Sequence, residues 1–163
     1  MLRLNATMGA LSLLFSSITG IPQEFTEVPT TLIPIRAGSH VWGDFDNDGD
    51  LDVIVSGTGG SEYSTRIYLN DGSGGFVEVP GAFPAQMSGT LAVADFDRDG
   101  RLDVLVGVNL FRNEGSGKFT LLTNALPGVS SGICAWGDFN NDGSPDVLYS
   151  GGSLILKYMS PGE

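Results

Sequence analysis

The sequence predicts an all-β fold made of β-propeller blades, and three observations lead to this prediction. An aspartate- and glycine-rich segment occurs three times in the 163 residues, each time between two short apolar runs. The chain has 24 glycines, and short apolar runs bounded by glycine and other turn residues indicate strands. The repeat length of 43 to 51 residues matches a four-stranded propeller blade.

The spacing of the acidic segments shows that they share one register. Asp95 follows Asp44 by 51 residues, and Asp138 follows Asp95 by 43. A phenylalanine stands 19 residues before the first aspartate of every copy, so the repeat has a constant length upstream of the acidic segment. The eight extra residues of the first repeat therefore fall after that segment, within 56–65. Such agreement between independent landmarks indicates a true internal repeat.

Each repeat is expected to contain four short strands. The first begins at the phenylalanine, the second enters the acidic segment, the third leaves it, and the fourth runs to an Asn-x-Gly hairpin turn. These turns are at 70–72 and 113–115. The expected strands are 25–28, 40–42, 52–55 and 66–69; 76–79, 91–94, 103–106 and 109–112; and 119–122, 133–136, 146–149 and 154–158. They would form blades that span about 25–70, 76–113 and 119–158.

Two features concern the ends of the chain. A basic start, a short apolar run and a small-x-small site predict a secretory signal peptide at 1–20, ahead of a propeller domain at 21–163. The alternatives are an arbitrary start or a strand of a preceding blade. Three blades are fewer than the about 4–8 of a closed propeller. We therefore expect either part of a longer chain, which we favour, or a homodimer in which two copies close a six-bladed ring.

The charge of the chain is concentrated in the three acidic segments. The net charge is −11, which makes nucleic acid an unsuitable partner because phosphate binding needs basic residues. Twelve of the 19 acidic residues lie in 44–52, 95–103 and 138–146. Carboxylates packed this closely repel one another unless a cation lies among them. The single cysteine, Cys134, excludes an intrachain disulfide and is expected to be a core residue.

The acidic segments share the pattern Asp-x-[Asp/Asn]-x-Asp-Gly-x-x-Asp, which predicts a calcium loop. Calcium takes roughly 6–8 oxygen ligands, and an all-oxygen set disfavours zinc and copper. Side chains at positions 1, 3, 5 and 9 and the carbonyl at position 7 can converge on one ion, while glycine at position 6 permits the bend. Up to three Ca²⁺ ions are expected. The side-chain ligands would be Asp44, Asp46, Asp48 and Asp52; Asp95, Asp97, Asp99 and Asp103; and Asp138, Asn140, Asp142 and Asp146; the carbonyls would be those of Asp50, Arg101 and Ser144.

These segments are not expected to be EF-hands or to bind calcium equally. An EF-hand needs a glutamate at position 12 between two helices, whereas position 12 is apolar or aromatic and both flanks are strands. The first segment has the most carboxylates, the second has Arg98 and Arg101 beside its ligands, and the third has a neutral ligand, Asn140. Because ligand charge tunes affinity, the first segment should bind calcium most tightly.

The motif Asp-Phe-[Asp/Asn]-x-Asp-Gly-x-x-Asp-Val resembles the FG-GAP/VCBS repeats of integrin α-subunit propellers and of many secreted bacterial proteins. Residues 144–146, Ser-Pro-Asp, are especially similar to the integrin repeats. The resemblance covers about 25–158. It implies a β-propeller with calcium in the hairpin loop of each blade, an extracellular setting, and a role in adhesion or ligand binding.

The sequence favours a non-catalytic module that binds an unknown protein or glycan ligand. The alternative is an accessory or catalytic propeller of a secreted polysaccharide-active enzyme. The only histidine is His40, and the carboxylates outside the acidic segments form no evident pair. No stretch is long and apolar enough to span a membrane. Tyr63, in the inserted residues, is a candidate ligand contact on the face opposite the calcium loops. The alternative is that the insertion is only a tolerated extension of a loop. Blade packing is expected from Trp42, Phe45, Phe96, Trp136 and Phe139.

Overall fold

Antiparallel β-sheets make up the regular structure of the chain. The computed structural model describes residues 25–123, 125–126, 132–150 and 154–156, so the predicted signal peptide at 1–20 lies outside the described residues. Within the described ranges there is no helix that could cross a membrane. The strands are β1 (Arg36–Gly43), β2 (Asp52–Gly59), β3 (Glu62–Asn70), β4 (Phe76–Glu78), β5 (Leu91–Ala94), β6 (Asp103–Val106), β7 (Asn109–Gly115), β8 (Lys118–Leu122), β9 (Cys134–Gly137), β10 (Asp146–Tyr149) and β11 (Leu154–Leu156).

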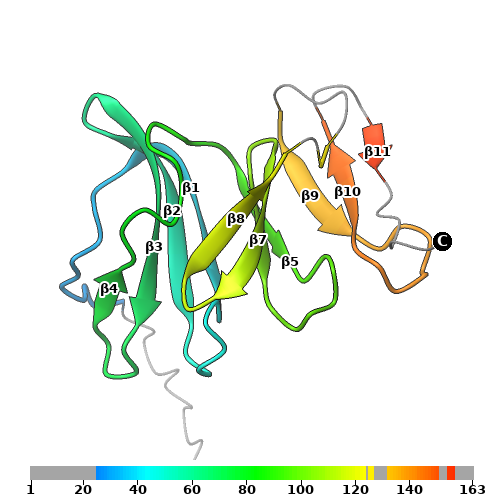
Figure 1. The fold of residues 1–163 in the computed structure, drawn as a ribbon. Coiled ribbons are helices and arrows are strands. Elements are labelled where there is room, and N and C mark those ends of the chain that lie inside the picture. Colours follow the sequence, from blue (N-terminus) through cyan, green and yellow to red (C-terminus); the bar gives the residue numbers. More distant parts are fainter. Residues whose placement is uncertain (1–24, 124, 127–131, 151–153, 157–163) are drawn as a thin grey trace, which may run out of the picture.

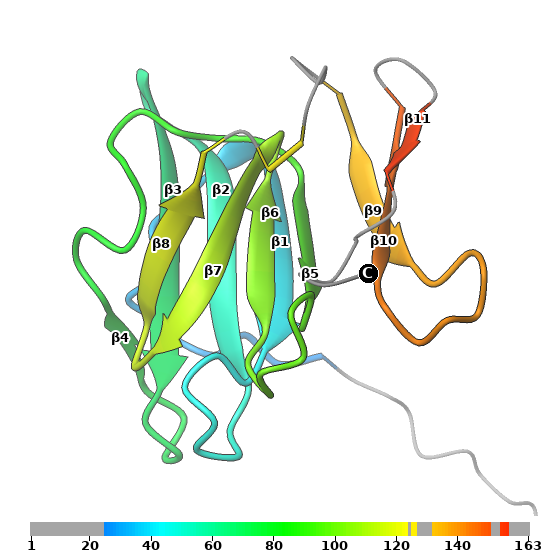
Figure 2. The same cartoon turned by 45° about the vertical axis from the view of Figure 1, so that its right-hand side comes forward.

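The strands form three sheets that stand side by side, as Figure 1 shows. The first blade has the order β1-β2-β3-β4, the second has β5-β6-β7-β8, and the third has β9-β10-β11 among the described residues. Neighbouring blades meet through their first strands, since β1 contacts β5 and β5 contacts β9. Figure 2, turned by 45°, shows the same three-sheet arrangement. The predicted all-β fold of partial-propeller blades is therefore confirmed.

Each of the first two sheets begins one strand later in the sequence than the blade that the sequence predicts. The phenylalanine-initiated strand β4 pairs with β3, with Asn70 opposite Phe76 and Tyr68 opposite Glu78, so it completes the sheet of the preceding repeat. β8 pairs with β7 in the same way. The reason is local, because a tight Asn-x-Gly turn brings these strands together at a lower loop-closure cost than a long connection.

The expected strand at Phe25–Val28 does not form. These residues have no regular structure, and the Phe25 side chain is fully exposed. In the second and third repeats the corresponding strand pairs with the last strand of the repeat before it. No such sheet precedes Phe25 in the part of the chain that the structure describes, so its backbone has no strand to pair with.

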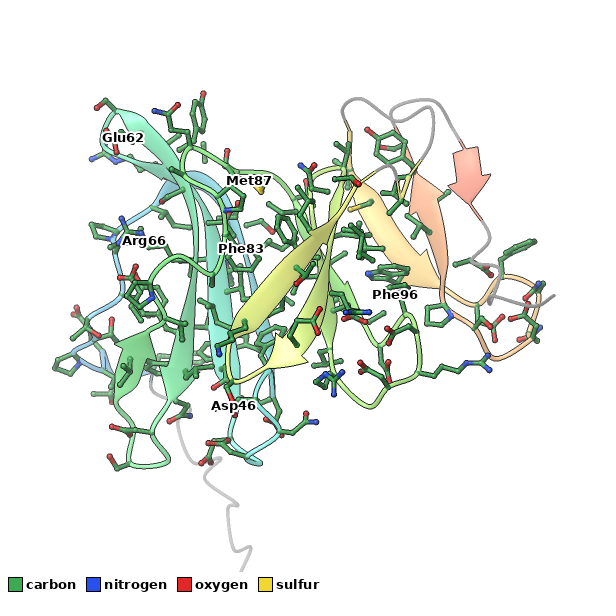
Figure 3. All side chains as sticks on the ribbon, in the orientation of Figure 1. Asp46, Glu62, Arg66, Phe83, Met87 and Phe96 are labelled. Atoms are coloured by element: carbon green, nitrogen blue, oxygen red, sulfur yellow. The ribbon has the colours of Figure 1, made fainter. Side chains whose placement is uncertain are left out.

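The inserted residues lengthen the hairpin between β2 and β3. β2 continues to Gly59 and β3 begins at Glu62, with these two residues opposite each other. The equivalent hairpin in the second blade closes much earlier, with Val106 opposite Asn109. Figure 3 places Glu62 and Asp46 at opposite ends of the first blade. The inserted hairpin therefore lies on the face away from the acidic loops.

Apolar side chains fill the two interfaces between blades. Phe45 and Ile54 of the first blade are completely buried against the second, where Val104 and Phe111 are the equally buried partners. Phe96 is one of the buried residues between the second and third blades, as Figure 3 shows. These clusters confirm the predicted packing roles of Phe45 and Phe96. The buried residues on the third blade's side of the second interface include Cys134, confirming its predicted core position, together with Val147 and Tyr149.

The two outer faces differ from each other. On the first blade, Tyr68 is buried beneath the segment 31–35, and the backbone N–H of Ile33 donates to its Oη at 3.3 Å. On the third blade, Phe139 is 59% exposed. The predicted packing role of Phe139 is therefore wrong among the described residues, because no described blade covers this face. Trp42 is also 52% exposed, and its ring meets that of Phe76 in the same sheet, with centroids 6.0 Å apart.

Candidate metal centre

Loops one (44–52), two (95–103) and three (138–146) share the same wrapped backbone. In loop one, Asp44 Oδ1 accepts the N–H of Asp48 at 3.0 Å, and Oδ2 accepts that of Gly49 at 3.0 Å. The aspartates at position 1 of the other loops make the same pair of bonds, at 3.0 and 2.9 Å in loop two and at 3.1 and 2.8 Å in loop three. Each loop is thus folded around its first carboxylate.

Two left-handed residues bend each loop. The glycine at position 6 has φ of 98°, 85° and 83° in the three loops, as the motif predicts. The residue at position 4 is also left-handed, although it is never glycine: φ is 60° at Asn47, 61° at Arg98 and 58° at Asn141. The calcium-loop pattern places no ligand at position 4. Its left-handed conformation is a shared feature of all three loops.

The aspartate at position 9 ties loops one and two to their sheets. Asp52 is fully buried, and its two oxygens accept the N–H groups of Phe45 and Asn70, both at 2.8 Å. Asp103 is also fully buried and accepts the corresponding bonds from Phe96 at 3.0 Å and Asn113 at 2.8 Å. These aspartates therefore serve the fold whether or not they also contact an ion, a role that the spacing alone did not reveal.

The carboxylates at positions 1, 3 and 5 converge in loops one and two. In each loop, one carboxylate oxygen from each of the three side chains lies within 4.8 Å of the others. Asp46 Oδ1 is buried and has no hydrogen-bond partner among the described residues. A buried oxygen without a donor is costly. The two clusters are Asp44, Asp46 and Asp48, and Asp95, Asp97 and Asp99.

The repeated loops and sheets agree with a comparison against known families. A family model described as the FG-GAP-like repeat matches residues 44–106 and 107–149. The chain belongs to the FG-GAP-like repeat family. Searches of curated proteins and of solved structures found no match. The family assignment therefore rests on the two FG-GAP-like repeats themselves, each of which includes one or more of the acidic loops.

Burial and mutual repulsion perturb the carboxylates of the FG-GAP-like loops. Burial raises the pKa of Asp46 above its ordinary value, and the negative charges of Asp48 and Asp44 raise it further. Burial also raises the pKa of Asp103 to about 6, although the N–H bonds from Asn113 and Phe96 oppose this shift. Without a bound cation, Asp46 and Asp103 are therefore protonated more readily than an ordinary aspartate.

Loop three lacks a third carboxylate in its cluster. Asn140 occupies position 3, and its Nδ2 donates to Asp142 Oδ2 at 2.9 Å. The Oδ1 of Asn140 accepts the N–H of Asp142 at 3.1 Å. Asp146 Oδ1 is buried with no described donor. Loop three therefore has an oxygen-bearing side chain at each of the same loop positions, with one negative charge fewer.

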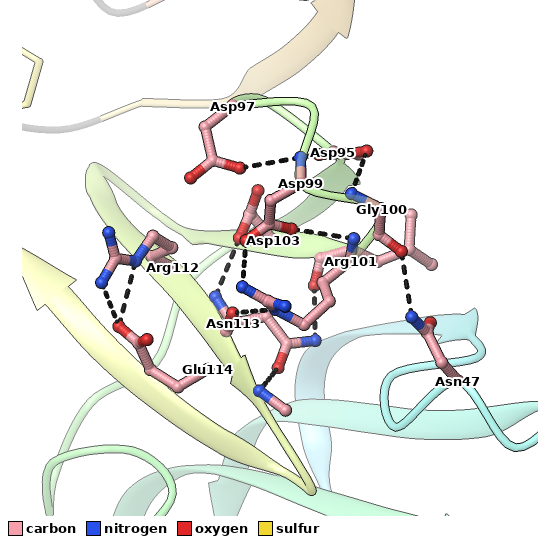
Figure 4. Close-up of polar contacts among 12 residues, drawn as sticks. Asn47, Asp95, Asp97, Asp99, Gly100, Arg101, Asp103, Arg112, Asn113 and Glu114 are labelled. Atoms are coloured by element: carbon pink, nitrogen blue, oxygen red, sulfur yellow. Dashed lines mark hydrogen bonds and ion pairs between the residues drawn. The ribbon is translucent and has the colours of Figure 1, made fainter.

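Arginine compensates part of the charge in loop two. The Arg101 guanidinium forms an ion pair with Asp99, and its Nε donates to the carbonyl of Asn113 at 2.8 Å (Figure 4). Loop one receives no arginine hydrogen bond within the described ranges. A cation entering loop two would compete with Arg101 for Asp99. This contact supports the expectation that loop one binds calcium more tightly than loop two.

Asp50, the remaining carboxylate of loop one, points toward the neighbouring turn. A Cβ at Gly72 would come within 2.8 Å of Asp50 Oδ2, so this carboxylate lies against the turn at 70–72. The expected contribution of Asp50 is its backbone carbonyl, which this side-chain direction leaves unaffected. Gly72 is left-handed with φ of 71°, which also favours glycine there.

The donor set of the FG-GAP-like loops fits a hard divalent cation. The converging groups of loops one and two are carboxylate oxygens, which suit calcium and not a soft metal. The buried Asp46 Oδ1 lacks a donor, and like-charged oxygens crowd together around it. A bound cation would satisfy both conditions at once.

Proposed function

We propose that the chain is a calcium-binding β-propeller module that acts outside the cell, in adhesion or in binding a protein or glycan ligand, without catalysis. The observation that carries the proposal is the convergence of three carboxylates in each of two loops, with one buried oxygen left without a donor. Family membership adds support, because similar repeats occur in extracellular propellers.

The proposed ligands are the groups at loop positions 1, 3, 5, 7 and 9. The side chains at positions 1, 3 and 5 supply the clustered oxygens, position 7 supplies its carbonyl, and position 9 supplies a carboxylate already fixed by backbone N–H groups. A bound calcium ion supplies positive charge that offsets the repulsion among these oxygens. The role of the metal is therefore structural: it holds each loop in the bent form that joins two strands of a blade.

The ligand is proposed to bind on the face opposite the metal loops. The long β2–β3 hairpin projects there and carries Tyr63, whose side chain is 56% exposed. Tyrosine combines a large apolar surface with a hydroxyl group, and so it suits contacts with proteins and with sugars. A rigid blade carrying such a hairpin is a common way to present a binding loop.

The absence of a catalytic step is proposed because, outside the acidic loops, the acid and base candidates that the structure describes have other partners or stand alone. Glu78 pairs with Arg66 at 3.1 Å, and Glu114 pairs with Arg112 at 2.6 Å. His40 is exposed in β1. Incubation with a panel of polysaccharides, followed by an assay for new reducing ends or unsaturated products, tests this proposal. Turnover of any of them would favour the enzyme alternative.

Calcium should raise the thermal stability of the chelator-treated protein. Each ion that binds only the folded state contributes about 2.7 kcal/mol when its concentration is 100 times the Kd. The measurement is differential scanning calorimetry together with a calorimetric titration that counts up to three ions. Magnesium is the matched control and should stabilise less, because it keeps its water ligands. Neither heat of binding nor a shift in Tm at millimolar calcium would refute the proposal.

Loop one should be the tightest site. Changing position 3 to alanine in one loop at a time, as Asp46→Ala, Asp97→Ala or Asn140→Ala, removes one equivalent ligand from each loop. Asp46→Ala should cause the largest loss of high-affinity binding, since loop one has the most carboxylates and no described arginine bond. A calcium titration of the three variants checks the ranking. Equal losses of calcium binding in the three variants would show that ligand charge does not determine which loop binds calcium most tightly.

A further inference from the structure

We infer that the side chain at position 4 of loops one and two positions the metal ligands of the loop in the next blade, so that the sites are linked in one direction along the chain. The consequence for calcium rests on the proposed function, whereas the contacts themselves do not. Position 4 lies outside the ligand pattern, and so its side chain is free for this role.

The first contact runs from loop one to loop two. Asn47 Nδ2 donates to the carbonyl of Gly100 at 3.0 Å, although the residues are 53 positions apart (Figure 4). The N–H of Gly100 is itself bonded to Asp95 Oδ2 at 2.9 Å. Gly100 lies between Asp99, a proposed side-chain ligand, and Arg101, a proposed carbonyl ligand. Asn47 therefore fixes the peptide that joins two ligand positions of loop two.

The second contact runs from loop two to loop three. Arg98 Nη2 donates to Ser144 Oγ at 2.7 Å and lies 3.4 Å from the carbonyl of Asp142. Asp142 and Ser144 occupy positions 5 and 7 of loop three, on either side of Gly143. Arg98 packs over that glycine, since a Cβ there would lie 3.3 Å from the guanidinium. In both cases the contact falls within positions 5 to 7 of the loop in the next blade, which we call the receiving loop.

The backbone explains why the contacts recur. Position 4 is left-handed in every loop, with φ of 60° at Asn47, 61° at Arg98 and 58° at Asn141. Equal backbone conformations in equivalent loops send the side chain in an equivalent direction, toward the following blade. Asn141 is exposed and has no hydrogen-bond partner in the described part of the chain. It is therefore a matched control at the same loop position, with no receiving loop among the residues that the structure describes.

Glycine substitutions at position 4 test the inference without adding backbone strain, because glycine accepts a positive φ. Hydrogen exchange measured in chelator follows each loop separately. Asn47→Gly should speed exchange in peptides covering 95–103, and Arg98→Gly in peptides covering 138–146, each by about fivefold, as expected for one lost hydrogen bond. Asn141→Gly should leave the exchange of the other two loops unchanged.

Calcium binding provides a second measurement. In a background of Asp46→Ala and Asn140→Ala, loop two is the remaining intact site. Adding Asn47→Gly to this background should weaken its calcium binding by about fivefold, whereas adding Asn141→Gly should not. Ser144→Ala removes the hydroxyl that accepts from Arg98. When it is combined with Arg98→Gly, the exchange of loop three should change little further, because Arg98→Gly has already removed the bond to this hydroxyl.

The outcomes separate this inference from the proposed function. Faster exchange confined to the mutated loop, or spread evenly over the chain, would overturn the inference. Faster exchange in the receiving loop together with unchanged calcium affinity of loop two would overturn the link to the metal ligands. If calcium does not bind the unmodified protein, the proposed function fails, while exchange in chelator still decides whether the loops are linked.

Discussion

Replacing Phe45 with alanine should destabilise the protein by about 3–5 kcal/mol, the range for removing a fully buried phenylalanine. The ring has no exposed surface and lies between the first and second blades. Its edge meets the Phe119 ring, with centroids 6.2 Å apart. The loss should therefore include a cavity at the interface between blades. Denaturant unfolding at a fixed calcium concentration measures it.

Phe139→Ala is the matched control, because Phe139 occupies the same position in loop three. Its side chain is 59% exposed, so the change should stay within about 0.5 kcal/mol. Phe96→Ala, at the equivalent and nearly buried position, should resemble Phe45→Ala. Similar losses for Phe45 and Phe139 would contradict the prediction and would mean that the outer face of the third blade is covered in solution.

The same contrast shows how far the sequence predicts the fold. The local pattern predicts where strands enter and leave each loop, and the strands that flank the loops confirm it within a few residues. The pattern at Phe25 and Phe139 is equally good, yet one segment forms no strand and the other side chain is exposed. Both outcomes depend on whether another sheet lies alongside, which a short local motif does not encode.

The candidate site is likewise predictable from the sequence only in part. The motif indicates which oxygens could ligate a cation, because ligand chemistry depends on residue type and spacing. It does not show that Asp52 accepts two backbone N–H groups or that Arg101 turns back onto Asp99. Nor does it pair Asn47 with Gly100, since that contact depends on how two blades stack. Spacing within one repeat carries no information about the distance between repeats.

Asp103→Ala should destabilise the protein even in chelator, by about 3 kcal/mol, because two buried N–H groups would lose their acceptor. The donors are those of Phe96 and Asn113, and the carboxylate between them is fully buried. Asp97→Ala is the control. It removes a carboxylate from the cluster of loop two without taking an acceptor from the sheet, so it should weaken calcium binding and leave the stability in chelator nearly unchanged.

The pH dependence in chelator gives an independent signature of the same aspartate. Burial raises the pKa of Asp103 to about 6, from an ordinary value of 3.8 that applies when the chain is unfolded. Between these values the folded protein binds the extra proton, so stability should fall as pH rises from about 4 to 6, by about 3 kcal/mol, and change little above that. Asp103→Ala should remove this part of the slope and Asp97→Ala should keep it. If the two variants behave alike in chelator, Asp103 has no role in the fold beyond that of any acidic residue in the loop.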